Sequence, residues 1–163
     1  MPVYLALSMG LNIHLLLYIM STIIEKEQYI ILYRSSHLFL ISGLYALYRG
    51  HYSLCPAPSI VFLTSVNYWR YPDRSWRLDL DVYVVRLAIL YQTIMEYNAQ
   101  YRFIYYSLFT TSVLYPLGQY YYYKGDHWKY TYLQMTCHIL ANIGNIILYS
   151  GYIDQHEVYD RIL

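Results

Sequence analysis

The stretch Ser65–Asp81, SVNYWRYPDRSWRLDLD, determines how the rest of the chain is interpreted. It contains three arginines and three aspartates in a chain that is otherwise poor in charge, and apolar, tyrosine-rich runs flank it on both sides. A short charged segment between long apolar runs is typical of a loop at a membrane surface. We therefore expect residues 70–79 to form a charged hairpin that joins two membrane-spanning segments.

The composition indicates a membrane protein rather than a soluble globule. Of the 163 residues, 58% are hydrophobic and 13% are charged, and the mean hydropathy is +0.23. Soluble domains carry about 25% charged residues. A deficit spread over the whole length is typical of a polytopic protein that has the lipid bilayer as its surroundings. The formal net charge of +1 argues against nucleic acid as a partner, because phosphate binding needs clustered lysine and arginine.

Apolar runs divide the chain into about six segments, each near the roughly 20 residues that cross a bilayer as a helix. Helices are expected because every backbone polar group in lipid must be paired, and the chain lacks the alternating pattern of a barrel. The predicted fold class is all-α, a polytopic transmembrane helical bundle of about six spans in a single domain, residues 1–163. The segments are Val3–Ile24, Tyr29–Tyr48, a short one from the Cys55–Pro58 turn to Trp69, Leu80–Tyr97, Tyr101–Tyr122 and Trp128–Ile153.

Basic residues are distributed unequally between alternate loops. The side that holds the central hairpin also carries lysines at 26, 124 and 129 and an arginine at 34, whereas the opposite side has arginines at 49, 102 and 161. By the positive-inside rule, the hairpin lies on the cytoplasmic side and both termini lie on the opposite side. The 25 tyrosines fit such a protein, because each ring buries well while its hydroxyl needs a partner or the wet interface.

Arg86 is the clearest ionisable residue inside a predicted span. Such residues are costly in lipid and are functional candidates by default. Asp79 lies seven residues before it, on roughly the same helix face, and Asp81 lies five residues before it. We expect the aspartate and Arg86 to neutralise each other and to fix helix packing. A substrate-contacting role is the alternative.

The last segment carries a polar stripe of His138, Asn142 and Asn145, at spacings of four and seven residues. These spacings place the three side chains on one helix face. Such a stripe more often forms hydrogen bonds to a neighbouring helix than binds a metal. The spacing leaves open whether the stripe is structural or functional.

The order of Ser65, Trp69, an aspartate at 79 or 81, and His138 with Asn142 resembles, in degraded form, a known superfamily of membrane hydrolases. This is the alkaline ceramidase and progestin-adiponectin receptor superfamily, described by Ser-x-x-x-His, a later Asp and a late His-x-x-x-His, with three histidines that bind zinc. Trp69 stands where the first histidine would be, and Asn142 where the last would be. The resemblance implies a scaffold that has lost its metal chemistry, because a catalytic zinc needs about three protein ligands.

Two longer phrases carry a second resemblance. NYWRYPDRSWRLDLD and HILANIGNIILYSGY are similar to uncharacterised small polytopic membrane proteins of large DNA viruses and protists. The function we expect is therefore a non-catalytic integral membrane protein with a structural or assembly role, in a virion or a larger membrane complex. Protein partners would contact Arg74, Trp76 and Arg77, because aromatic and arginine side chains dominate interface energetics. No cofactor is expected.

Two alternatives remain open. One is a zinc-dependent lipid amide hydrolase that uses Ser65 and His138 with an aspartate at 79 or 81, and recruits His51 or His127 as further zinc ligands. The other is a small transporter or channel with Arg86, Glu96 and Asn145 along a polar path.

Overall fold

The computed structural model describes residues 23–109 and 113–153 of the chain. Within these residues the regular secondary structure is helical, apart from an isolated antiparallel bridge between Ala99 and Ile153. The all-α class predicted from the sequence is thus confirmed. Most of the first predicted segment, Val3–Ile24, and both chain termini lie outside the described residues.

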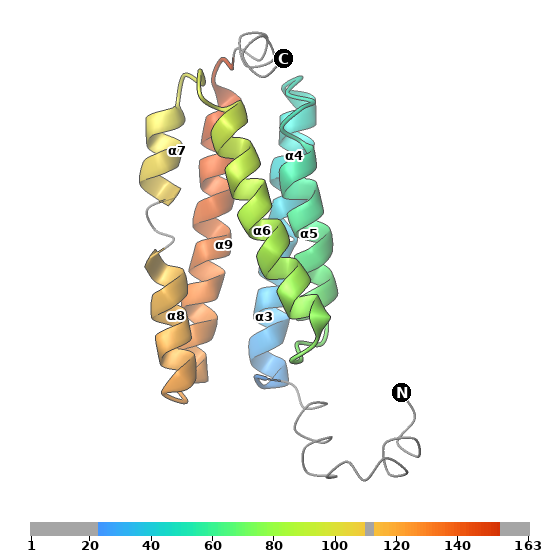
Figure 1. Ribbon diagram of the computed structural model, residues 1–163, viewed down its shortest axis with the longest axis vertical. Helices are drawn as coiled ribbons and strands as arrows, with labels where there is room; N and C mark the ends of the chain where they lie inside the picture. Colours follow the sequence, from blue (N-terminus) through green and yellow to red (C-terminus); the bar gives the residue numbers. More distant parts are fainter. Residues whose placement is uncertain (1–22, 110–112, 154–163) are drawn as a thin grey trace.

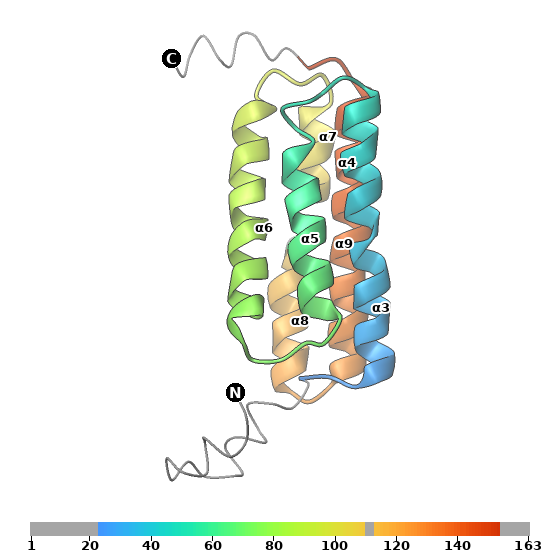
Figure 2. The same ribbon diagram turned by 90° about the vertical axis from the view of Figure 1, so that its right-hand side faces the viewer.

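The helices of the described part lie roughly along one axis and form an elongated bundle (Figure 1). α9 packs against α3, α4, α7 and α8, and α5 packs against α3, α4 and α6. Figure 2 shows α6 at the edge of the bundle, next to α5. The helices are α3 (Lys26–Ser36), α4 (Leu38–Tyr48), α5 (Pro56–Trp69), α6 (Trp76–Met95), α7 (Arg102–Phe109), α8 (Leu114–Tyr123) and α9 (His127–Ser150).

Local sequence explains where several helices begin. α3 opens with a capping box of Glu25 and Gln28, and α5 has Pro56 in its first turn, where no backbone N–H is needed. Ser75 and Asp126 are the N-caps of α6 and α9, and each side chain accepts a hydrogen bond from a backbone N–H of the first turn. These caps lie at the ends of the apolar runs and define the long helices.

The central charged segment is shorter as a loop than the sequence suggested. α6 begins at Trp76, four residues before the predicted start at Leu80, because Ser75 caps the helix. The non-helical part of the predicted hairpin 70–79 is therefore residues 70–75. Arg77 and Asp79 belong to the first turn of α6.

The described part of the predicted fifth segment, Tyr101–Tyr122, forms two helices. α7 ends at Phe109 and α8 begins at Leu114. Pro116 lies in the first turn of α8, a position that tolerates proline because its missing N–H would have no partner there. In the third segment, α5 has 14 residues, and His51 to Leu54 do not join it.

Among the described residues, Lys26–Tyr48 is the one helical stretch that is long and apolar enough to cross a membrane, judged by length and composition. It comprises α3 and α4, which meet at His37. The His37 ring bonds through Nδ1 to the carbonyl oxygen of Tyr33 at 2.9 Å. The second predicted segment therefore contains a stretch with the length and composition of a membrane span.

Two apolar clusters occupy opposite ends of the bundle. The first is formed by Ala46, Leu54, Met95, Ala99, Tyr105, Leu148, Tyr149 and Ile153. The second is formed by Ile24, Leu32, Tyr68, Trp69 and Tyr130. The first cluster lies beside the 96–101 turn and the second beside the 70–75 turn. The middle of the bundle, between the two clusters, contains buried polar side chains such as Ser42 and Asn142.

Candidate functional site

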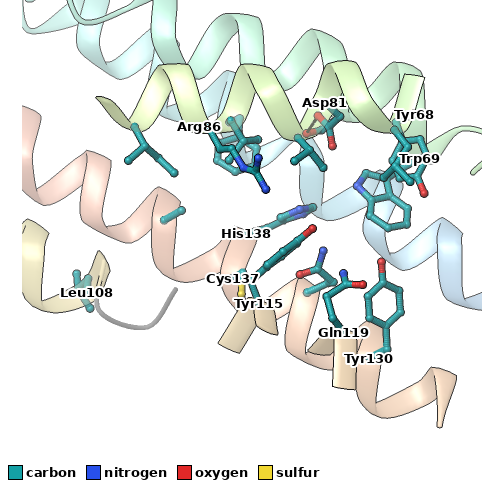
Figure 3. A pocket seen from close by; sticks show the side chains of 18 residues that line it. Tyr68, Trp69, Asp81, Arg86, Leu108, Tyr115, Gln119, Tyr130, Cys137 and His138 are labelled. Atoms are coloured by element: carbon teal, nitrogen blue, oxygen red, sulfur yellow. Dashed lines mark hydrogen bonds between the residues drawn. The ribbon is translucent and has the colours of Figure 1, made fainter. Parts of the chain in front are cut away.

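A partly open cavity of about 290 Å³ lies between the α5–α6 pair and the α8–α9 pair. Apolar side chains form much of its wall, among them Val82, Val85 and Ile89 of α6, Leu108 of α7 and Ala141 of α9. Figure 3 shows polar side chains from α6, α8 and α9 entering the same space. An apolar cavity with a few polar groups is the usual form of a ligand-binding site.

Asp81 is the acidic group of the cavity wall, and its side chain is fixed by α5. The residue is 8% exposed, and Oδ1 accepts hydrogen bonds from Ser65 Oγ at 2.7 Å and from Thr64 Oγ1 at 2.9 Å. A buried carboxylate needs such donors, because an unpaired one would lose its hydration without compensation. These bonds join α6 to α5 at the point where the cavity begins.

His138 projects from α9 towards α6 and lies opposite Asp81 and Arg86 in Figure 3. Its Nδ1 is 2.8 Å from Ser35 Oγ, and the Ser35 hydroxyl donates to the carbonyl oxygen of Leu32 at 3.0 Å. Because the Ser35 hydroxyl proton is already donated to Leu32, Ser35 Oγ accepts a hydrogen bond from Nδ1–H of His138. In the neutral ring Nε2 is then unprotonated and is an acceptor. His138 thus offers an acceptor nitrogen to this space.

Arg86 is the cationic side chain of the cavity wall, and it is exposed. The ion pairs within the described residues are Arg77–Asp73 and Lys129–Asp126, each at 2.8 Å. The expected neutralisation of Arg86 by Asp79 is therefore not formed. Asp79 is an exposed residue in the first turn of α6, and Asp81 is bonded to α5 instead. Arg86 faces the cavity without an anionic partner.

Two further polar groups in the wall have no hydrogen-bond partner. Tyr68 is 1% exposed and Gln134 is 7% exposed, yet the Tyr68 hydroxyl and Gln134 Oε1 make no hydrogen bond. Leaving a buried polar group unsatisfied costs about 1–3 kcal/mol. Both residues line the end of the cavity that Trp69 and Tyr130 also line. This end therefore has unused hydrogen-bonding capacity inside the fold.

Of the residues proposed from the sequence, Ser65, Asp81 and His138 all line this cavity. His51 lies in the turn between α4 and α5, where Nε2 is 3.2 Å from the carbonyl oxygen of Tyr149, close to the end of α9. His127 begins α9. The histidines proposed as zinc ligands are thus spread along the whole length of α9 and do not surround one point.

The part of the chain that the structure describes contains no group of three His, Cys, Asp or Glu side chains that could hold a metal ion. A catalytic zinc needs about three protein ligands and an open position. In the cavity, Nδ1 of His138 is taken by Ser35, and the neighbouring wall residues Trp69 and Gln134 are not zinc ligands of the usual kind. The described residues of the cavity wall do not form the donor set of a catalytic zinc.

The two asparagines of the predicted stripe lie in a separate hydrogen-bonded group. Ser42 Oγ donates to Asn142 Oδ1 at 2.9 Å, and Gln92 Nε2 donates to Asn145 Oδ1 at 3.2 Å and to the hydroxyl of Tyr149. We call these five residues the polar ladder. It joins α4, α6 and α9 in the half of the bundle that holds the 96–101 turn.

Gln134 is the cavity residue that the sequence interpretation missed. It lies one helical turn before His138 and lines the cavity, whereas Asn142 lies one turn after His138 and belongs to the polar ladder. The cavity-facing pair on α9 is therefore Gln134 and His138. Gln134 and Asn142 both lie four residues from His138, one before it and one after it, and the sequence contained no signal that favoured Gln134.

The residues of the proposed transporter path do not meet in one place. Arg86 lines the cavity and Asn145 is part of the polar ladder. Glu96 lies at the end of α6, fully buried, and its two carboxylate oxygens have no hydrogen-bond partner. These three side chains are distributed over different levels of the bundle.

The turn before α6 is held by Arg77. Its guanidinium pairs with Asp73 and donates to the carbonyl oxygens of Tyr71 at 2.7 Å and Asn67 at 3.2 Å. Partial burial favours the neutral acid of Asp73, but hydrogen bonds from Ser75 and Arg77 outweigh it and lower the pKa of Asp73. Arg77 is thus used within the fold, whereas Trp76 is 68% exposed and Arg74 is also an exposed residue.

Comparisons with known proteins add no relative to this picture. The chain matches no family model, no curated protein and no solved structure. The candidate site is therefore defined by the geometry of this chain, with Ser65, Asp81, Arg86 and His138 around one apolar cavity.

Proposed function

We propose that this chain is a non-catalytic integral membrane protein, a bundle of about six spans whose cavity binds a lipid-like ligand. The observation that carries the proposal is the cavity between α5–α6 and α8–α9, which combines an apolar wall with unused hydrogen-bonding groups. A cavity that served packing alone would be filled by side chains, and its polar groups would bond to each other.

The membrane location is supported by the surface of the bundle. The Lys26–Tyr48 stretch is long and apolar enough to span a bilayer. α6 exposes a row of large apolar side chains, namely Leu80, Tyr83, Leu87, Leu90 and Ile94. Water-soluble proteins rarely expose a continuous apolar face of this kind. In this arrangement the 70–75 turn lies on the cytoplasmic side of the membrane, as the distribution of basic residues predicts.

The absence of hydrolytic chemistry is supported by the identity of the wall residues. When the resemblance to the ceramidase and progestin-adiponectin receptor superfamily is placed on this fold, Ser65, Asp81 and His138 keep positions around the cavity. Trp69, in the cavity wall, and Asn142, bonded to Ser42 in the polar ladder, then stand where two zinc-binding histidines would be. A tryptophan ring and a neutral amide do not replace histidine as ligands of a catalytic zinc. The scaffold would retain the cavity and lose the metal.

Occupancy of the cavity can be measured through its thiol. Cys137 lines the cavity, whereas Cys55 belongs to the apolar cluster near the 96–101 turn. A Cys55→Ala variant, purified in a neutral detergent, reports reaction of Cys137 with a small thiol reagent. We expect long-chain amphiphiles to slow this reaction, and native mass spectrometry to detect a co-purified lipid. Full reactivity in the presence of every amphiphile tested would refute ligand binding.

A second role, assembly into a membrane complex or virion, is favoured by one observation. Trp76 is exposed directly after a turn that Arg77 and Asp73 hold in place. A rigid, exposed tryptophan is a typical anchor of a protein interface. If it forms contacts between copies of this chain, Trp76→Ala reduces cross-linking between two differently tagged copies in one membrane, whereas Tyr83→Ala, another exposed aromatic of α6, leaves it unchanged.

A further inference from the structure

Arg86 lies near the middle of α6, the position at which a charge is least easily accommodated in a membrane. α6 runs from Trp76 to Met95, so Arg86 is roughly 15 Å from each end at 1.5 Å per residue. An arginine near a helix end can extend its side chain to the interface, but one at mid-depth needs a partner inside the bundle. The surroundings of Arg86 therefore have to supply hydrogen-bond acceptors, and an anion is the strongest of these.

The described carboxylates do not supply it. Asp73 and Asp126 are paired with Arg77 and Lys129. Asp81 accepts its hydrogen bonds from α5, Asp79 is exposed in the first turn of α6, and Glu96 is buried at the far end of the helix. Within the described chain, Arg86 makes no hydrogen bond and no ion pair. Its guanidinium has five donors available in a planar fork that suits carboxylate and phosphate oxygens.

The cavity provides the space for such an anion. Figure 3 shows the guanidinium of Arg86 directed from α6 into the cavity, on the side of His138 and Tyr115. Apolar side chains adjoin it on the same helix, from Val82 and Val85 to Ile89. The volume of about 290 Å³ is at the lower end of the roughly 300–1,000 Å³ of small-molecule sites, which favours one hydrocarbon chain over two.

We infer that the cavity binds a single-chain amphiphile with an anionic head, and that Arg86 holds the head group. The inference rests on the proposed function and adds the class of ligand. The Asp81 carboxylate would repel an anion, and Nε2 of His138, an acceptor, would not bind one. The hydrogen-bond donors for an anionic head are the guanidinium of Arg86 and the hydroxyl of Tyr115. The apolar wall of α6, α7 and α9 covers the chain. A carboxylate and a phosphate head share this chemistry.

The test uses the full-length Cys55→Ala protein in a neutral detergent and follows protection of Cys137 from a thiol reagent. The probes are palmitate and lysophosphatidate as anionic amphiphiles, a monoacylglycerol of the same chain length as the uncharged control, and inorganic phosphate. We expect both anionic amphiphiles to protect at concentrations at least about tenfold lower than the uncharged one, the change expected from hydrogen bonds to a charged group. Inorganic phosphate alone gives no protection.

The variants Arg86→Gln and Arg86→Lys give the deciding comparison. Arg86→Gln removes the preference for anionic heads, so that charged and uncharged amphiphiles protect at similar concentrations, whereas Arg86→Lys retains part of the preference. Size-exclusion profiles and Tm values show whether each variant is folded. If Arg86→Gln does not fold, Arg86→Lys is compared with the parent protein instead. Equal protection by charged and uncharged amphiphiles, or by phosphate alone, overturns the anionic-amphiphile inference while ligand binding stands. Protection by no amphiphile at all overturns the proposed function as well.

Discussion

The polar ladder and the end of the cavity that Tyr68 and Gln134 line differ in how far their buried polar groups are hydrogen-bonded, although Glu96, near the ladder, also has carboxylate oxygens without a partner. In the half with the 96–101 turn, the polar ladder bonds Ser42 to Asn142 and Gln92 to Asn145 and Tyr149, across three helices. In the half with the 70–75 turn, Tyr68 and Gln134 have atoms without partners. The two halves are built from the same helices, α6 and α9, so the difference is not one of helix type.

This difference separates structural from functional polarity. A satisfied polar group in a helix interface specifies which helices meet and in which register, and its contribution is to the stability of the fold. An unsatisfied group beside a cavity lowers stability and is retained where a ligand completes it. By this criterion the polar ladder stabilises the packing of the helices, and the cavity is the candidate ligand-binding site.

The largest expected effect comes from breaking the ladder. Asn145→Leu removes one of the two acceptors of Gln92 Nε2 and leaves one N–H of this buried amide without a partner, which we expect to lower the free energy of unfolding by about 1–3 kcal/mol. Thermal unfolding in detergent measures it. Thr136→Ala is the matched control on α9, because its hydroxyl bonds within the same helix to Tyr132, and it should change Tm little. An unchanged Tm for Asn145→Leu would remove the structural role of the ladder.

The same kind of change in the other half should have the opposite sign. Tyr68→Phe removes a hydroxyl that has no partner, so we expect stability to stay equal or to rise by up to about 1 kcal/mol. Gln134→Leu on α9 removes an unpaired carbonyl oxygen but also the side-chain hydrogen bond to Tyr130, so we expect a smaller net change. Protection of Cys137 by amphiphiles should weaken in both. A marked loss of stability would show that these atoms are satisfied within the fold.

A smaller effect is expected at the turn that borders the cavity half. The pKa of Asp73 is lowered in the folded protein, so its pairing with Arg77 stabilises the fold above the ordinary carboxyl pKa of about 4 and is lost as the pH falls through the folded value. Asp73→Asn should reduce stability near pH 7 by less than about 1 kcal/mol. At pH 2 to 3, Tm values of the variant and the parent should converge; a constant difference over this range argues against the pairing.

The smallest expected effect is that of metal removal. Because His138 is the one histidine of the cavity wall among the described residues, chelation with EDTA should leave Tm and Cys137 protection unchanged. Metal analysis of the purified protein checks this directly. Stoichiometric zinc would contradict the proposal of a non-catalytic ligand site, because the cavity would then be a metal centre of the hydrolase type.

Much of the helical layout could be predicted from the sequence. The apolar runs and the charged stretch located α3–α4, α6 and α9 within a few residues, and Lys26–Tyr48 agrees with the predicted second segment. The start of α6 was placed too late because the charges of Arg77 and Asp79 were counted as loop, although Ser75 is a good N-cap. The division of the fifth segment into α7 and α8 was also missed, although Pro116 marked it.

The candidate site was predictable only in part. The choice between Asp79 and Asp81 was open in the sequence, and the structure places Asp81 beside Ser65 on the cavity wall. Spacing also put Asp79 on the face of Arg86, yet no pair forms, because a shared face brings side chains near each other only when their rotamers and neighbours allow it. The stripe of His138, Asn142 and Asn145 bonds to neighbouring helices as expected, but to three different ones, through Ser35, Ser42 and Gln92.

The sequence by itself determined which stretches become helices and where the charged turn lies, because caps, apolar runs and prolines act over a few residues. Only the tertiary structure decided that Ser65, Asp81, Arg86 and His138 face one cavity while Asn142 and Asn145 face a ladder. The physical reason is that a helical period defines a face of a helix, whereas the rotation and pairing of several helices, set by packing between distant segments, define what that face meets.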